Sequence, residues 1–398
     1  MLTPEVQTIL FQTLMSNKVA IVGVGYTPPR PKTPDVSYKE MTYEAAVSSY
    51  NDAHLASHRD IDGFVTCAED FIEGTSIFDE YTPDQLGAVQ KPVHTICGDF
   101  LHGLAIGTMK IKTGLMDIVA VEAHSKASNI KTYYHIVNYA LDPVWNRPLN
   151  VNPYYIAGLE MQYFMHHTGT TEEQIAQVVV KNKKNALHND LSCYAGSVSQ
   201  KQVLKSQPTF TPLRALEMSE HVDGAFVFVL AHEDVAKKLQ KNPVWITGCG
   251  WSSDSPTLET RNWNECEYAK RSTKSALKQA GLKNLNQFDF FEIDDTFAYK
   301  ELQHLEGIGL YEKGEAGKAC LNGDLNCDGK TPVNISGGTL GVGSLLEASG
   351  GIRALEVVKQ LRGEAGKRQL QKPKRALALS WRGIPTTSGV VLTFEGTQ

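Results

Sequence analysis

A cysteine stands where a short β-like run meets a helical pattern, in the segment HTICGDFLHGLAIGTMKIKTG at 94–114. The run leads into Cys97, and the helical pattern ends at Gly114. A helix dipole at this junction favours a thiolate, whereas a free cysteine of pKa about 8.5 is only slightly ionised at neutral pH. Cys97 is therefore a candidate nucleophile; the alternative is a small buried apolar side chain.

Two adjacent carboxylates form a second candidate site. Asp294 and Asp295 follow the apolar run FFEI and precede an amphipathic helical pattern within 290–317. Proteins of the α/β class place functional groups at the carboxyl ends of strands, so the pair is a candidate acid. Alternatively, Asp295 or Thr296 caps the helix that follows.

Glycines and other small residues crowd positions 336–351, ahead of a clean helical pattern. Dense glycine lets a backbone approach a ligand closely and offers amide donors. This segment is therefore a candidate ligand-binding turn.

The elements that must position these groups repeat along the chain. VAIVGVGYT at 19–27 matches VWITGCGWS at 244–252, and each is followed by a helical pattern (near 39–57 and 265–281) and a short strand (60–67 and 287–295). This predicts a duplicated unit with largely parallel, helix-covered sheets. We expect an N-terminal extension at 1–17, a first half at 18–236 with an inserted region at about 125–218, and a second half at 243–398.

The paired glycines of these strands do not form a dinucleotide fingerprint, because Thr27-Pro28-Pro29 breaks the chain where a helix should begin. We expect them to allow close packing or a tight exit turn.

Composition narrows the function. The chain has 398 residues and a formal net charge of −5, which gives no electrostatic footprint for nucleic acid. It has no apolar run long enough to span a membrane and no signal-peptide pattern at its start, so we expect no membrane association. The seven cysteines are irregularly spaced and include no CxxC pair. We therefore expect the protein to reside in a reducing cytoplasm and this chain to hold no metal site.

Several segments resemble the thiolase superfamily, in the branch of the sterol-carrier-protein-type and archaeal acetoacetyl-CoA thiolases. The resemblance extends from about residue 18 to 395 and includes VAIVGVGYT, GTTEEQIAQVVVKNKKNALHN at 169–189, SEHVDGAFVFVLA at 219–231, LEGIGLYEKGEAG at 305–317 and LRGEAGKRQ at 361–369. It implies the thiolase fold, with two mixed sheets of duplicated βαβ-type halves in five αβαβα layers. It also implies acyl-CoA substrates and Claisen chemistry.

The family's site residues carry over only in part. A gap-free match places Cys97 at the family nucleophile, whereas a two-residue slip places Asp99 there. The oxyanion-hole motif reads DDTF and puts Asp294 at the donor position; the histidine of the "GHP" motif is replaced by Ser344; and the late catalytic residue is replaced near 380–384. Only a protonated carboxyl at Asp294 donates to an oxyanion.

Other groups must then replace the lost histidines. We expect His124, at the end of a strand that faces the site in this family, to be one candidate, with His94 and His221 as weaker ones; a structural role for His124 is the alternative. We expect coenzyme A, which is both substrate and product, to bind at Gly337, Gly338, Gly343, Ser219 and Arg214.

Three functions remain open. The first is a divergent thiolase or acyltransferase on bulky or aromatic 3-oxoacyl-CoA, working through Cys97 as a homodimer with a small zinc-ribbon/OB-fold partner. The second is an acyl-CoA aldolase that uses Asp294 and Ser344 as its acid/base pair. The third is a non-catalytic CoA-binding subunit.

Overall fold

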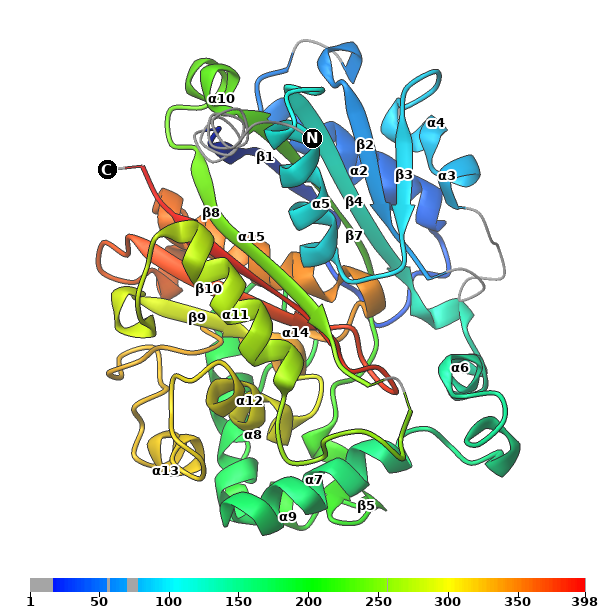
Figure 1. Ribbon diagram of the computed structural model, residues 1–398, viewed down its shortest axis with the longest axis vertical. Coiled ribbons are helices and arrows are strands. Elements are labelled where there is room, and N and C mark those ends of the chain that lie inside the picture. Colours follow the sequence, from blue (N-terminus) through cyan, green and yellow to red (C-terminus); the bar gives the residue numbers. More distant parts are fainter. Residues whose placement is uncertain (1–16, 56–57, 70–77, 256, 398) are drawn as a thin grey trace, which may run out of the picture.

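A computed structural model describes residues 17–55, 58–69, 78–255 and 257–397, so most of the expected N-terminal extension lies outside the described residues. Within them, nine strands form one twisted sheet in the order β3-β2-β4-β7-β1-β8-β11-β10-β9 (Figure 1). Their bounds are β1 (Val19–Tyr26), β2 (Gly63–Cys67), β3 (Val93–Ile96), β4 (Ile118–Lys126), β7 (Asp223–His232), β8 (Val244–Ser253), β9 (Phe290–Ile293), β10 (Arg375–Trp381) and β11 (Ser388–Glu395). A separate hairpin joins β5 (Pro208–Phe210) and β6 (Leu213–Arg214).

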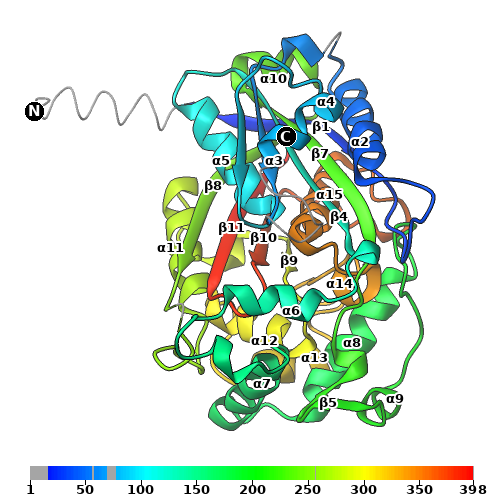
Figure 2. The same ribbon diagram turned by 90° about the vertical axis from the view of Figure 1, so that its right-hand side faces the viewer.

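Helices cover both outer faces of the sheet and fill the space between its two halves (Figures 1 and 2). α2 (Tyr38–Asp52) and α10 (Glu233–Leu239) pack outside the first half, and α11 (Glu267–Ala280) packs outside the second. α5 (Phe100–Lys112) and α15 (Ser349–Arg362) lie between the halves, in a core cluster that takes apolar side chains from both. The five-layer αβαβα arrangement is confirmed.

The sheet is mixed, so the expectation of largely parallel strands was wrong. The mixed strand pairing that the family resemblance implies is confirmed, although the strands of both halves join in one continuous sheet rather than two. β2 runs parallel to β3 and β4, and β9 runs parallel to β10. The pairs β1–β7, β4–β7, β1–β8, β8–β11 and β10–β11 are antiparallel. A strand–helix–strand unit fixes parallel pairing only between its own two strands. The strands that complete each half reverse direction and therefore pair antiparallel with their neighbours.

The paired glycines of β1 and β8 have the same task in both halves. A Cβ atom on Gly25 would lie 1.9 Å from the carbonyl oxygen of Ala45 in α2. A Cβ atom on Gly250 would lie 2.0 Å from the carbonyl oxygen of Ser272 in α11. Both strands therefore need glycine so that the outer helix can approach, which confirms the close-packing prediction.

The two halves of the sheet meet where β1 pairs with β8 over three residues. Val19 lies opposite Ile246, Ala20 opposite Trp245, and Ile21 opposite Val244. Beyond this short contact, β8 pairs with β11 and β1 pairs with β7.

The region 125–218 contains helices of five to 15 residues and packs against the second half. Its elements are α6 (Tyr133–Val137), α7 (Tyr155–Thr168), α8 (Glu172–Ala186) and α9 (Gln200–Leu204), together with the β5–β6 hairpin. Apolar side chains of α7 and α8 share a core cluster with α12 (Ala298–Gly307) and α13 (Ala316–Leu321). The remaining helices are α3 (Phe78–Tyr81), α4 (Pro83–Leu86) and α14 (Gly338–Val342).

Candidate functional site

A small polar cavity of about 50 Å³ lies where loops from both halves meet. Its wall takes residues from the loop after β9, the segment between α14 and α15, the loop after β10, the approach to β7 and the inserted region. The side chains that bear on chemistry are Tyr133, Tyr154, His221, Asp294, Ser344 and Arg382. The volume suits a reacting carbonyl group rather than a whole acyl-CoA molecule.

The segment before α5 separates the two nucleophile candidates. Asp99 is the N-cap of α5: its carboxylate accepts from the Leu101 N–H at 2.9 Å and from the Gly350 N–H at 2.7 Å, and it is buried. Cys97 is exposed two residues earlier. The structure thus gives Asp99 a capping role and leaves Cys97 accessible at the amino end of the helix.

A guanidinium from the cavity wall lies within charge-interaction range of this cysteine. Burial opposes the charged form of Arg382, but the Glu69 carboxylate and the Cys97 thiolate outweigh it and raise the pKa of Arg382. The Arg382 Nε atom donates to Glu69 at 2.5 Å. Arg382 lies in the loop after β10, within the segment where the family resemblance places its late catalytic residue.

Asp294 reaches the cavity but is held by an ion pair. Its Oδ2 atom lies 2.7 Å from Nη2 of Arg353, and the Thr296 N–H donates to Oδ1 at 3.1 Å. Both charged side chains are almost fully buried. A carboxylate paired in this way accepts hydrogen bonds and does not donate one to an oxyanion.

Asp295 does not cap the helix that follows it. It accepts from the backbone N–H groups of Thr339 at 2.7 Å and Leu340 at 3.1 Å, at the start of α14. A Cβ atom on Gly338 would lie 2.0 Å from its Oδ2 atom, at a φ of +59°. The glycine-rich turn therefore encloses a carboxylate of this chain, which differs from the expected contact with a ligand.

The other residues assigned to CoA lie in packed surroundings. Added Cβ atoms would meet Ala186 at Gly337 and Val222 at Gly343, both at 2.5 Å. Arg214 pairs with Glu172 at 2.9 Å. The Ser219 N–H donates to the Thr296 carbonyl oxygen at 2.9 Å, and Ser219 Oγ is buried.

His124 lies on the face of the sheet opposite α5, contrary to the expectation that it faces the site. Its Nδ1 atom is 2.7 Å from Glu122 Oε1, and its ring stacks on Tyr38 with centroids 4.8 Å apart. Ser344 does line the cavity, beside His221. His221, predicted as a weaker candidate, lies two residues before the buried strand β7 and lines the cavity.

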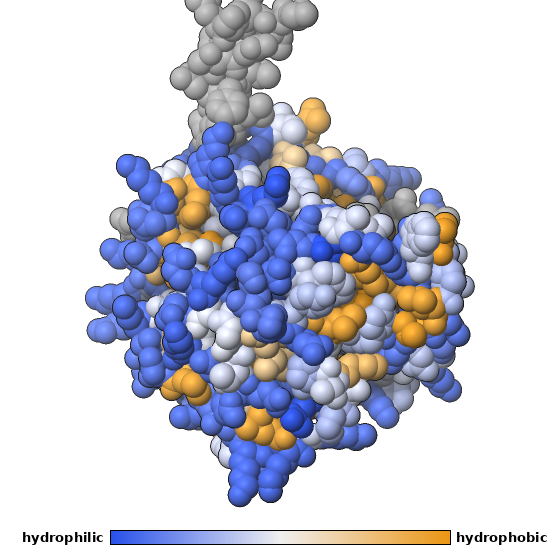
Figure 3. Space-filling view, turned by 60° about the horizontal axis from the view of Figure 1, so that its bottom comes forward, coloured by the Kyte–Doolittle hydropathy of each residue, from blue (hydrophilic) through white to orange (hydrophobic). Residues whose placement is uncertain are grey.

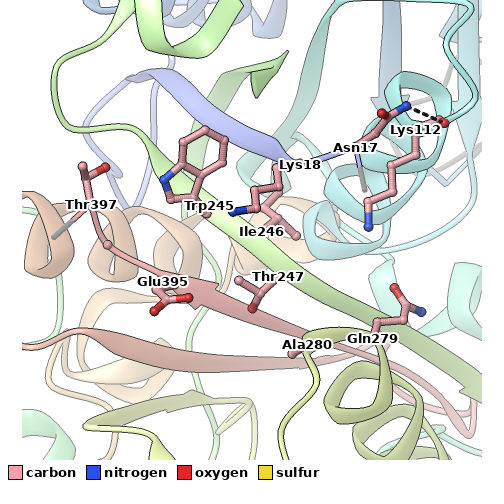
Figure 4. A pocket seen from close by; sticks show the side chains of 11 residues that line it. Asn17, Lys18, Lys112, Trp245, Ile246, Thr247, Gln279, Ala280, Glu395 and Thr397 are labelled. Carbon is pink, nitrogen blue, oxygen red and sulfur yellow. Dashed lines mark hydrogen bonds between the residues drawn. The ribbon is translucent and has the colours of Figure 1, made fainter. Parts of the chain in front are cut away.

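A larger hollow lies elsewhere, near the start of β1 and β8 (Figure 4). Lys18, Lys112, Trp245, Gln279 and Glu395 surround it, and it contains no nucleophile beside an acid or base. Among the described residues, no three His, Cys, Asp or Glu side chains gather as a metal site, and no helix is long and apolar enough to cross a membrane.

Comparison with known proteins gives the family. The chain is 30% identical over 379 residues to an acetyl-CoA acetyltransferase of Methanothermobacter thermautotrophicus, covering 94% of this chain and 98% of the relative. It is 28% identical over 397 residues to sterol carrier protein 2 of Bos taurus, covering 92% and 70%. Residues 250–394 match the "Thiolase C-terminal domain-like" family model. The chain belongs to the thiolase superfamily, in its sterol-carrier-protein-2-type branch.

Two further similarities bear on substrate and assembly. The chain is 28% identical over 218 residues to benzoylsuccinyl-CoA thiolase subunit BbsB of Thauera aromatica, covering 54% of this chain and 56% of the relative. A solved structure titled "Ltp2-ChsH2(DUF35) aldolase" superposes with a TM-score of 0.81 at 22% identity, covering 94% and 97%. At that identity the structural likeness shows the fold. The sequence relatives place the chain among acyltransferases of CoA thioesters.

Proposed function

We propose that this protein is a thiolase-type acyl-CoA C-acyltransferase that forms an acyl-cysteine on Cys97. The sulfur bonds to the 3-oxo carbon of a 3-oxoacyl-CoA, and the C2–C3 bond breaks. The electron pair of that bond stays on C2, in the fragment that carries CoA. This fragment leaves as a thioester enolate, which takes a proton to give an acyl-CoA. The thiol of free CoA then attacks the acyl-cysteine and releases the second acyl-CoA.

The observation that carries this proposal is the surroundings of Cys97. Cys97 is exposed two residues before Asp99, the N-cap of α5, and its charge contributes to the raised pKa of Arg382. A helix amino end and a cation each lower a thiol pKa, and in this proposal they take the part of the usual histidine in activating Cys97. Ser344, at the position of that histidine, has no basic group.

We propose further that the working enzyme contains a homodimer and a small zinc-ribbon/OB-fold partner, and acts on bulky or aromatic acyl groups. β3 is an edge strand of the sheet, which leaves one side for another chain.

Exposed apolar side chains gather in the inserted region: Tyr139 is 75% exposed, Trp145 70% and Val144 69%. Figure 3 shows apolar residues on the side where α6 lies in Figure 1. Such patches are typical of interfaces. A benzoylsuccinyl-CoA relative named as a subunit, and a structural neighbour titled as two components, support the partner and the aromatic substrate.

Intact-mass spectrometry with acetoacetyl-CoA and benzoyl-CoA tests this function, with and without the partner. We expect an acyl adduct that maps to Cys97 and is absent in Cys97→Ala. Cys249→Ala is the matched control, because that thiol is buried and its pKa is raised to about 11 by burial. An adduct on another residue contradicts the proposal. Absence of both adduct and turnover, with CoA bound, favours a non-catalytic subunit.

An acyl-CoA aldolase is the second candidate. Asp294 and Ser344 line the same cavity, and the solved structure titled as an aldolase shares the fold. The ion pair of Asp294 with Arg353 argues against Asp294 as the acid. Full aldol cleavage by Cys97→Ala would establish this reading in place of the first.

A further inference from the structure

His221 and Ser344 are held side by side in the cavity wall. Their backbones form a parallel bridge, in which the Val222 N–H donates to the Ser344 carbonyl oxygen at 2.9 Å. The Ser344 N–H donates in turn to the Glu220 carbonyl oxygen at 2.7 Å. Residues paired in this way point to the same face, and both line the cavity.

One nitrogen of the His221 ring has no partner. The Nε2 atom lies 3.3 Å from the Tyr154 hydroxyl, and the Tyr133 ring stands at 62° to the imidazole, with centroids 4.9 Å apart. The Nδ1 atom is buried and has no hydrogen-bond partner among the residues that the structure describes. A buried nitrogen without a hydrogen bond is unfavourable, and a bound ligand that accepts from it or donates to it would remove this cost.

A neutral His221 ring can present Nδ1 as a hydrogen-bond donor. Burial lowers the pKa of His221 to about 4, so the ring is neutral at pH 7 and carries one proton. Burial raises the pKa of Tyr154 well above its usual value, so its hydroxyl keeps a proton. A neutral hydroxyl can donate to Nε2 or accept from it; the proposed hydrogen bond uses the form in which it donates, which places the ring proton on Nδ1.

We propose that the Nδ1–H group of His221 donates a hydrogen bond to the thioester oxygen of bound acyl-CoA and stabilises the enolate of the proposed reaction. When the C2–C3 bond breaks, its electron pair moves into the enolate and negative charge develops on that oxygen. Asp294, which also lines the cavity, accepts from Arg353 and does not supply a proton there. His221 is thus a catalytic residue.

This inference rests on the proposed function only for its acyl-CoA carbon–carbon chemistry. Claisen cleavage through Cys97 and aldol cleavage both release a thioester enolate. The donor can therefore be tested in a protein that lacks the nucleophile, which separates its failure from the failure of the acyl-cysteine proposal.

The test is difference infrared spectroscopy of acyl-CoA bound to Cys97→Ala, with ¹³C at the thioester carbonyl of acetoacetyl-, benzoyl- and propionyl-CoA. We expect binding to lower the carbonyl stretching frequency, His221→Leu to abolish the lowering, and His221→Asn to keep part of it, because the asparagine amide nitrogen replaces Nδ1. With Cys97 restored, His221→Leu should slow acylation by about 100–1,000-fold, the loss expected for one oxyanion donor.

His304→Leu is the matched control for the loss of a buried neutral imidazole. Its pKa is also lowered to about 4 by burial, but its nitrogens lie 2.8 Å from the Tyr268 hydroxyl and 3.1 Å from the Asp294 carbonyl oxygen. It should lower the unfolding temperature and leave the carbonyl shift in place. A shift that survives His221→Leu, or no shift with any of the three thioesters, overturns the inference. An adduct at Cys97 without the carbonyl shift would leave the acyltransferase proposal in place and rule out only the role of His221. The carbonyl shift without an adduct would support the role of His221 and contradict the acyl-cysteine.

Discussion

Breaking the buried ion pair between Asp294 and Arg353 should destabilise the protein strongly. Asp294→Ala leaves the Arg353 guanidinium, whose side chain is 1% exposed, without its counter-ion. In the described part of the chain, its other side-chain hydrogen bond runs from Nη1 to the neutral Ser380 Oγ at 3.0 Å and does not neutralise the charge. Removal of one partner of a buried pair costs about 3–5 kcal/mol.

That cost converts into a measurable temperature shift. The entropy of unfolding is about 2.1 cal/mol/K per residue, or about 0.8 kcal/mol/K for the 398 residues. We therefore expect differential scanning calorimetry at a fixed scan rate to show Asp294→Ala unfolding about 4–6 °C below the parent. Glu267→Ala is the control, because its pair with Arg271 lies at the surface, where such pairs contribute less than about 1 kcal/mol.

The double variant decides the physical reason. Asp294→Ala with Arg353→Met removes both charges, so it should be less destabilised than the two single changes together. If the single effects simply add, or if Asp294→Ala shifts the transition no more than Glu267→Ala, the ion pair does not hold Asp294. That result would return Asp294 to the candidate acids.

Two further substitutions test the groups around the site. Gly338→Ala should lower the free energy of unfolding, measured with urea, several times more than Gly169→Ala does. Both glycines have positive φ, but only Gly338 lies against the Asp295 carboxylate. Equal effects of the two substitutions would refute this close contact. Burial and the neighbouring Glu356 raise the pKa of Glu292 to about 8, so the folded protein keeps a proton that the unfolded carboxyl loses above about 4.5. Stability should therefore fall as pH rises from about 4.5 to 8, and Glu292→Gln should flatten the part of this fall between pH 6 and 8; an unchanged slope in urea midpoints contradicts the assignment.

Much of the fold could be predicted because local patterns and the tertiary structure agree. The repeated strand motif, the β-like run before Cys97 and the helix after the glycine-rich turn all appear near the expected positions. Strand direction could not be predicted in the same way, because β7 and β11 find antiparallel partners far along the chain.

The site was less predictable because its polar groups are satisfied by distant residues. Nothing in DDTF indicates that Arg353 would neutralise Asp294, or that Asp295 would cap a turn more than 40 positions away. The face on which His124 lies follows from strand alternation, since Glu122 and His124 share the side away from α5. His221 could be related to the site only from the tertiary structure, in which the loop that carries it pairs with Ser344.

The register between β1 and β8 records how the chain is organised as a whole. Val19, Ala20 and Ile21 correspond by motif to Val244, Trp245 and Ile246, and the pairing is reciprocal about Ala20 and Trp245. A strand that meets its own equivalent in reverse defines a local two-fold axis, as in a symmetric dimer. The repeated strand and its outer helix are thus arranged as in a covalent pseudo-dimer. These elements exist twice, so one copy can keep the scaffold, as the paired glycines do, while the other is free to diverge in chemistry.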